Sequence, residues 1–154
     1  MILKCFINGK AVTADISPDM ALLEFVRSQG CYSVKRGCET SNCGLCTVWV
    51  DGTPVLSCST PAMRVEGKKV TTLEGVQKEV EEFAQFLGGE GAEQCGFCSP
   101  GFVMNVLAMV RELEDPTEDE IKEYLAGNLC RCTGYAGQLR AIQKYLAWKK
   151  EQEA

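Results

Sequence analysis

The stretch Cys38-Glu39-Thr40-Ser41-Asn42-Cys43-Gly44-Leu45-Cys46 places three cysteines within nine residues, and Cys58 follows after a short gap. A second set of four cysteines lies further along the chain, as C-x2-C and later C-x-C: Cys95, Cys98, Cys130 and Cys132. Each set supplies the four thiolates that one iron–sulfur cluster needs. Two complete sets in one chain indicate electron transfer between two centres.

The C-x4-C-x2-C spacing of the first set is typical of a plant-type [2Fe–2S] loop. Gly37, Gly44 and the small Ser41 let the backbone wrap closely around the cluster, so that N–H groups can donate to sulfur. Three basic side chains beside the cysteines can offset the negative charge of a cluster, although a solvated position explains each equally well: Lys35, Arg36 and Arg131.

Structural zinc is the alternative for a four-cysteine site. Zinc is usually bound by two C-x2-C pairs, which the first set does not supply, whereas the second set taken alone suits either zinc or an iron–sulfur cluster. The chain has no histidine, which excludes a Rieske centre, a His-ligated haem and a Cys2His2 finger. Of the two remaining cysteines, Cys5 is expected to be a buried thiol. Cys31 is expected to be buried too, although a role as a substitute ligand stays open.

The composition of the 154-residue chain, with 45% hydrophobic and 24% charged residues, is that of a globular protein. Its net charge is −5 and it has no basic, aromatic-rich patch, so nucleic acid is not an expected partner. No apolar run reaches the roughly 20 residues of a membrane span, and we expect no signal peptide. We therefore expect a reducing cytoplasm, where cysteines serve as metal ligands rather than disulfides. Without histidine the commonest general base is missing, so we expect bond-breaking chemistry to occur on another subunit.

Residues 1–72 are expected to form a small β-rich domain. Asn8-Gly9 and Asp51-Gly52 each stand between two alternating apolar runs and predict two hairpins. Between the hairpins, Ser17-Pro18 is expected to open a helix that ends just before Gly30. A helix packed on a mixed sheet, with a long cysteine loop, is the arrangement of a β-grasp, plant-type ferredoxin-like domain.

In residues 73–154 the apolar period changes from two to 3.6, which predicts a four-helix bundle that binds the second cluster. Ser99 is expected to be the N-cap of the second bundle helix, with Pro100 at its first position. Thr117 and Glu120 predict a capping box for the third helix, which Gly127 is expected to end. The second cysteine set then lies in two turns between helices. The fold class is therefore α+β.

Two groups of motifs resemble a known family. They are Gly37-Cys38-Glu39, Cys43-Gly44-Leu45-Cys46-Thr47-Val48 and Ser57-Cys58 in the first half, and Gln94-Cys95-Gly96-Phe97-Cys98-Ser99-Pro100-Gly101 and Gly127-Asn128-Leu129-Cys130-Arg131-Cys132-Thr133-Gly134-Tyr135 in the second. Together they resemble the iron–sulfur subunit of the molybdenum hydroxylases, the xanthine oxidase family. The resemblance implies a non-catalytic electron-transfer subunit of a molybdopterin-dependent, xanthine dehydrogenase-like oxidoreductase. It also implies a large molybdopterin-binding partner and usually a medium FAD-binding partner, in a hetero-oligomer.

The resemblance further implies an order of centres. Electrons from molybdenum would pass to the helical-domain cluster, then to the ferredoxin-like cluster, then to FAD. By the same resemblance Cys95, Cys98, Cys130 and Cys132 ligate the cluster nearer molybdenum, and Cys38, Cys43, Cys46 and Cys58 the one nearer FAD. Gln94 and Cys132 match positions that touch the pterin in the family. The alternative function is a free-standing two-cluster ferredoxin that diffuses between partners, and a second domain is not needed for that role.

Overall fold

A five-stranded mixed sheet forms the first half of the protein in a computed structural model that describes residues 1–154. Its strands, in the spatial order β2-β1-β5-β3-β4, are β1 (Ile2–Ile7), β2 (Lys10–Asp15), β3 (Thr47–Val50), β4 (Thr53–Leu56) and β5 (Lys69–Thr71). Only the β1–β5 pair is parallel. Both predicted hairpins are confirmed. Asn8-Gly9 and Asp51-Gly52 have positive φ at both positions, which is the geometry that a two-residue hairpin turn favours.

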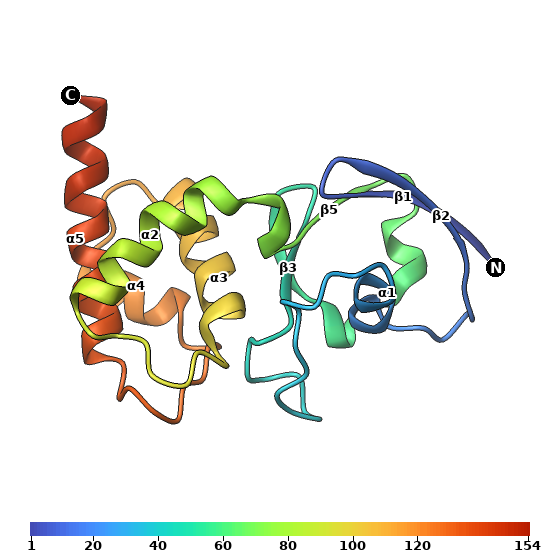
Figure 1. Cartoon of the computed structure of the whole chain (residues 1–154), viewed down its shortest axis with the longest axis horizontal. Coiled ribbons are helices and arrows are strands. Elements are labelled where there is room, and N and C mark those ends of the chain that lie inside the picture. The colour runs from blue at the N-terminus through green and yellow to red at the C-terminus, as the bar shows by residue number, and fades with distance from the viewer.

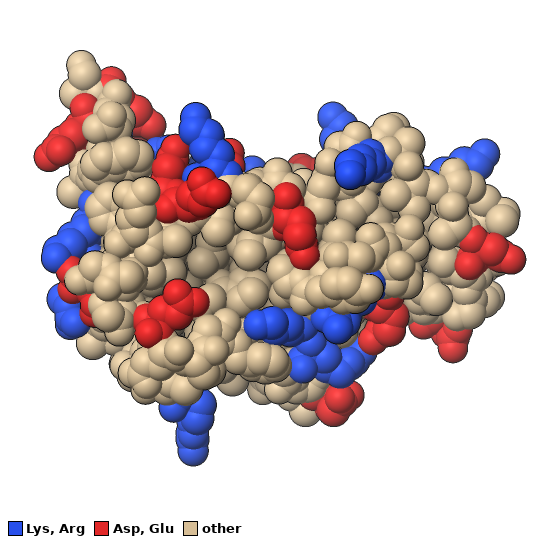
Figure 2. All heavy atoms as spheres, in the orientation of Figure 1, with Lys and Arg blue, Asp and Glu red and all other residues tan.

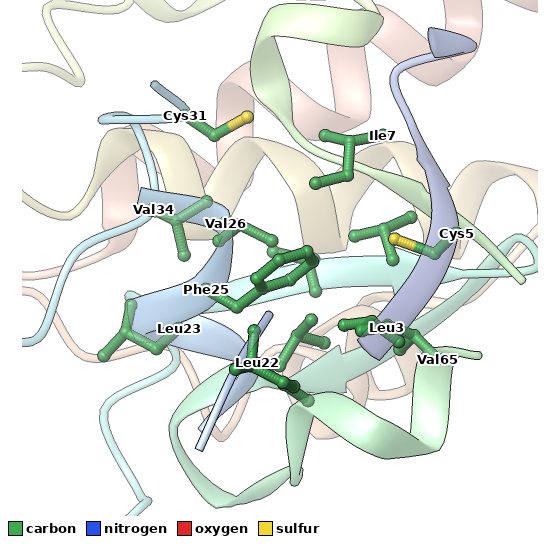
Figure 3. Packing of buried hydrophobic residues seen from close by; sticks show 14 of the residues in the cluster. Leu3, Cys5, Ile7, Leu22, Leu23, Phe25, Val26, Cys31, Val34 and Val65 are labelled. Atoms are coloured by element: carbon green, nitrogen blue, oxygen red, sulfur yellow. The ribbon is translucent and has the colours of Figure 1, made fainter. Parts of the chain in front are cut away.

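Helix α1 (Leu22–Ser28) packs on this sheet through a core of buried side chains. Alternate residues of β1 are buried, as the period of a strand requires. Figure 3 shows the ring of Phe25 from α1 lying between the side chains of Val26 and Leu3. Phe25 is fully buried, which contributes about 1.5–3 kcal/mol relative to an exposed side chain. This packing fixes the loop between α1 and β3, which carries the first three clustered cysteines.

The predicted start of α1 at Ser17-Pro18 is wrong, because the helix begins at Leu22. The backbone N–H of Met20 donates to Ser17 O at 3.1 Å and closes a turn instead. Ala21 then stays extended and forms an antiparallel bridge with Pro61. The tertiary pairing of Ala21 therefore outweighs the local helix-start signal. Gly30, just past the helix, has φ +88° as predicted for a helix end.

Four helices form the second half, as the apolar period predicts (Figure 1). They are α2 (Gln77–Gly89), α3 (Ser99–Glu112), α4 (Glu118–Tyr124) and α5 (Ala136–Glu153). Three short 3-10 segments complete the chain: η1 (Ser57–Ser59), η2 (Ala62–Val65) and η3 (Leu73–Gly75). Helix α3 is buried on most sides and lies at the centre of the second core. No helix combines the length and the apolar character needed to cross a lipid bilayer.

The helix ends agree with the sequence in part. The capping box of α4 is confirmed, since Thr117 Oγ1 accepts from the Glu120 N–H and the Glu120 carboxylate accepts from the Thr117 N–H. Two predicted boundaries are wrong. Ser99 is the first helical residue of α3 rather than its N-cap, because the Phe102 N–H already bonds Cys98 O, and the Ser99 hydroxyl donates to Glu93. Helix α4 ends at Tyr124, before Gly127, because a turn follows it directly.

The two halves share packing at β3, which Figure 1 places next to the helices. Trp49 of β3 is buried in the core of the helical half, not that of the sheet. Its indole N–H donates to Met104 O of α3 at 3.0 Å, and the Arg111 guanidinium lies 3.7 Å from the ring centroid. Arg111 also donates to Gly52 O at 3.1 Å. The sheet and the bundle are therefore joined by specific contacts.

A close approach of two backbone segments brings the cysteine loops together. Gly101, in the first turn of α3, lies against Gly44 and Leu45 of the first cysteine loop. A Cβ atom at Gly101 would lie 2.8 Å from Leu45 Cα and closer still to Gly44 O. Backbone atoms cannot rotate away as a side chain can, so this position requires glycine.

We predict that Gly101→Ala destabilises the protein by about 1–3 kcal/mol, because the added methyl group overpacks the junction of the two halves. Urea unfolding of the cluster-loaded protein, followed by circular dichroism, measures the change. Gly88→Ala is the control, since Gly88 lies in α2 with open space around it. That change is expected to stabilise the protein by about 0.5–1 kcal/mol. Equal stability of the two variants would contradict the role of Gly101.

Candidate metal centres

The first four cysteines come together at one end of the sheet. Cys38, Cys43 and Cys46 lie on the loop between α1 and β3, and Cys58 lies in η1 directly after β4. The thiol of Cys38 interacts with that of Cys43, and the thiol of Cys46 interacts with that of Cys58. Ser41 connects the two pairs, because its hydroxyl lies 3.4 Å from Cys58 Sγ. The set is thus arranged as two pairs of sulfur atoms.

Backbone amides surround the sulfur of Cys38. It accepts hydrogen bonds from the N–H groups of Asn42, Thr40 and Cys43, which stabilise a thiolate and lower the pKa of Cys38 to about 6. Cys46 differs, because burial raises its pKa to about 11. Binding iron would remove the protons from both thiols. The loop therefore provides donors for an anionic sulfur before any metal is bound.

Two predicted small residues have different tasks in this loop. A Cβ at Gly37 would lie 3.1 Å from Cys43 Sγ and 2.6 Å from Leu45 Cδ2, so the backbone does wrap closely there. Gly44 has φ +77° and faces the other half of the protein instead, with Asn128 Nδ2 only 2.6 Å from the position of a Cβ. Gly44 thus serves the contact between the halves as well as the turn.

The second four cysteines also come together. Cys95 and Cys98 lie between α2 and α3, and Cys130 and Cys132 lie between α4 and α5, as the sequence predicts. The sulfur atoms of Cys95 and Cys132 are 3.5 Å apart, and Cys98 interacts with Cys130. Burial raises the pKa of Cys98 to about 11, whereas Cys95 and Cys132 are exposed at the surface. This set is again two pairs of sulfur atoms.

Polar groups next to the second set bond its sulfur atoms and its backbone. The Phe97 N–H donates to Cys95 Sγ at 3.5 Å, and the Thr133 hydroxyl donates to Cys130 Sγ at 3.2 Å. Tyr135 ends the second motif of the sequence without an assigned role, and its hydroxyl accepts the Cys130 N–H at 3.0 Å. The backbone of Tyr135 has φ +70°, an uncommon conformation for a non-glycine residue. The sequence feature that could have indicated this role is the position of Tyr135 directly after Thr133-Gly134.

Pairs of thiolates fit a two-iron cluster, because each iron of a [2Fe–2S] core takes two cysteine ligands. A single zinc ion instead needs its ligands to converge on one point. Two pairs of cysteines in each set thus match the two iron atoms of a [2Fe–2S] core.

The two cysteine loops touch each other. The Leu129 N–H donates to Cys43 O at 2.9 Å, and Leu129 immediately precedes Cys130. Asn105 of α3 and Asn128 hold the same turn through a hydrogen bond between their side chains. One hydrogen bond thus connects a cysteine of the first set to the neighbour of a cysteine of the second.

The residues outside the two sets are placed as follows. Gln94 is exposed and directly precedes Cys95, whose sulfur lies 3.5 Å from that of Cys132. Cys5 is buried in β1, as predicted. Cys31 is buried among the side chains of the first core, where the Asn8 amide lies 3.7 Å from its sulfur. Burial raises the pKa of both Cys5 and Cys31, so both are protonated thiols in the core.

Two family models match the chain. The model described as "2Fe-2S iron-sulfur cluster binding domain" matches residues 5–72, and the one described as "[2Fe-2S] binding domain" matches residues 72–143. Among curated proteins, the xanthine dehydrogenase iron-sulfur-binding subunit of Escherichia coli O157:H7 is 47% identical over 137 residues, covering 86% of each chain. The nicotinate dehydrogenase small FeS subunit of Eubacterium barkeri is 39% identical over 142 residues, covering 90% of each.

Solved structures of two oxidoreductases have the same fold as this chain. A chain of quinoline 2-oxidoreductase from Pseudomonas putida 86 superposes with a TM-score of 0.89 at 35% identity, covering 99% of this chain and 96% of that one. The aldehyde oxidoreductase from Desulfovibrio desulfuricans ATCC 27774 superposes with a TM-score of 0.90 at 34% identity. There the match covers 98% of this chain but 17% of the other, so the same fold is part of a longer chain.

We predict that, once the clusters are removed with a chelator, iodoacetamide modifies Cys38 before Cys46 at pH 7. The reason is that Cys38, with a pKa of about 6, is mostly thiolate there, whereas Cys46, with a pKa of about 11, is protonated. Below pH 6 the lowered pKa no longer keeps Cys38 ionised, and its rate is expected to fall. Peptide mass spectrometry measures the rates, with urea-unfolded protein as the control. Faster reaction of Cys46 would contradict the arrangement of amides around Cys38.

Proposed function

Because this chain belongs to the iron–sulfur subunits of the molybdenum hydroxylase family, we propose that its eight clustered cysteines are the ligands of two [2Fe–2S] clusters. The protein is the electron-transfer component of a xanthine dehydrogenase-like oxidoreductase complex. In the proposal, Cys38, Cys43, Cys46 and Cys58 hold the cluster of residues 1–72. The remaining four, Cys95, Cys98, Cys130 and Cys132, hold the cluster of residues 73–154.

The arrangement of each cysteine set as two pairs of sulfur atoms is the observation that carries this proposal. When bound, each cluster accepts and returns one electron. The chain itself supplies the thiolates, the N–H donors that stabilise charge on sulfur, and the fixed spacing of the two sites. The Leu129–Cys43 hydrogen bond gives a continuous path of covalent bonds and one hydrogen bond between them.

We assign the exposed side of the second set to the molybdenum partner. Apolar side chains are exposed around it, with 49% exposure for Phe97, 47% for Leu129 and 44% for Tyr135. Large apolar side chains at one surface are typical of a protein interface. In the proposal, this surface contacts a large molybdopterin-binding subunit, and Gln94 and Cys132 contact the pterin.

The first set is assigned to the other end of the path. Cys38 and Cys58 are half-buried, beside the exposed Glu39 and Thr40. We place a medium FAD-binding subunit at this polar surface, so that electrons run from molybdenum through the second set and the first set to FAD. The complex would reside in the cytoplasm, where thiols stay reduced until they bind metal.

A diffusible two-cluster ferredoxin is the competing function. The exposed apolar surface around the second set favours a bound subunit, because a free carrier would leave it in water. Size-exclusion chromatography of the native protein distinguishes the two functions. A carrier would elute near 16.9 kDa, and a subunit at the mass of a larger complex.

We predict two distinct [2Fe–2S] clusters in the purified complex. Iron and acid-labile sulfide are each expected at about four per chain, with two paramagnetic signals after reduction. The signals should differ because no cysteine of the first set is exposed, whereas two cysteines of the second set are. Electron paramagnetic resonance and metal analysis check this prediction. Stoichiometric zinc in place of iron would refute the proposed function.

We predict that Gln94→Ala slows reduction of the clusters by substrate while leaving both clusters intact, because no ligand is removed. Loss of one neutral hydrogen bond is expected to weaken the contact with the pterin by about 0.5–1.5 kcal/mol. Stopped-flow absorbance of the complex measures the rate. Gln85→Ala, at an exposed position of α2, is the control. A wild-type rate with unchanged molybdenum spectra would rule out the role of Gln94.

A further inference from the structure

We propose that Lys35 is an electrostatic tuning residue, whose ammonium group raises the reduction potential of the helical-domain cluster. This inference rests on the proposed ligands of that cluster, Cys95, Cys98, Cys130 and Cys132. Lys35 itself belongs to the other half of the protein, on the loop between α1 and β3. A charge on one domain would thus set the potential of the centre in the other.

Lys35 contacts both cysteine loops at once. Its backbone N–H donates to the O atom of Leu45, which lies between Cys43 and Cys46, at 3.4 Å. Its Nζ donates to the O atom of Phe97, which lies between Cys95 and Cys98, also at 3.4 Å. The ammonium is 4.8 Å from the centroid of the Phe97 ring, where the face of the ring attracts a cation. Two separate contacts therefore hold the charge against the C-x2-C turn of the second set.

The charge of Lys35 is not neutralised by an acidic partner. No carboxylate lies within 4.0 Å of its Nζ, whereas the adjacent Arg36 forms ion pairs with both Glu24 and Glu39. Lys35 is half-buried, so salt screens its charge less than that of a fully exposed side chain. Figure 2 shows Lys and Arg side chains gathered on the visible face over the loop region that Figure 1 places beside the helices. Lys35 reaches across to the second cysteine set through its contact with Phe97.

One acidic side chain acts on the same turn with the opposite sign. Glu93 directly precedes Gln94, and its Oε1 accepts from the Ser99 hydroxyl at 2.9 Å. The same oxygen lies 3.3 Å from the position of a Cβ at Gly96, so the carboxylate also faces the C-x2-C turn. Lys35 and Glu93 therefore place charges of opposite sign against the same turn.

Reduction adds one negative charge to a cluster, so a nearby cation favours the reduced form and raises the potential, while an anion lowers it. The ammonium bonds the turn of the second set directly and reaches the first set only through its own backbone. The helical-domain cluster should therefore respond more strongly than the other. With its potential raised, this cluster is a better acceptor for the electron that arrives from the partner subunit.

Redox titration of the intact complex, followed by electron paramagnetic resonance, tests the proposal with Lys35→Gln. We expect the helical-domain cluster to become harder to reduce, by about tenfold in its equilibrium constant, which is about 59 mV for one electron. The ferredoxin-like cluster should shift less, and the g-values of both should not change. Lys35→Arg should retain the wild-type potential. Lys78→Gln is the matched control, since it removes an exposed charge from α2 without an ion pair.

Glu93→Gln provides an independent check with the opposite sign, because removing this carboxylate should raise the potential of the same cluster. The proposal would be overturned if the Lys35→Gln and Lys78→Gln variants had equal reduction potentials while both clusters gave normal signals. The proposed function would still stand in that case. If Lys35→Gln fails to load its clusters, an unmoved potential in Glu93→Gln overturns it instead. A wild-type complex without [2Fe–2S] signals would refute the proposed function itself.

Discussion

The contact between the backbones of Gly44 and Gly101 is the constraint on which the arrangement of this protein depends. It allows the first cysteine loop to lie directly against the start of α3, and it brings Cys43 O within hydrogen-bonding distance of the Leu129 N–H. Any side chain at these glycines would separate the two loops. Because electron transfer weakens steeply with distance, a separation of the loops would slow electron transfer between the two sets.

The junction is rigid as well as short. Trp49 of the sheet is buried in the helical core, and Arg111 of α3 holds both its ring and Gly52. Forming these contacts costs conformational entropy. A protein whose two clusters worked independently would not require them. They instead join the sheet and the bundle, and with them the two cysteine sets, in one arrangement. The division at residue 72 is thus crossed by specific contacts between the two halves.

Much of the fold could be predicted from local signals. Asn8-Gly9, Asp51-Gly52 and the Thr117–Glu120 pair each specify a turn or cap within a few residues, and all three are confirmed. The cysteine spacings likewise divided the eight residues into the two groups that the structure brings together. The start of α1 could not be predicted, because Ala21 pairs with Pro61, some 40 residues away. For the same reason no local pattern indicated that Lys35 contacts Phe97 or that Tyr135 bonds the Cys130 amide.

The second cysteine set lies in two turns that are far apart in the chain, and this has a thermodynamic consequence for the bundle. A cluster held by Cys98 and Cys130 closes a covalent ring that contains α3, α4 and the connection between them. Such a cross-link acts as a disulfide does, by removing conformations from the unfolded chain. The redox centre would therefore also stabilise the folded bundle. A protein without this cluster would lose the link between the α2–α3 turn and the α4–α5 turn, and it would also lose its path for electrons.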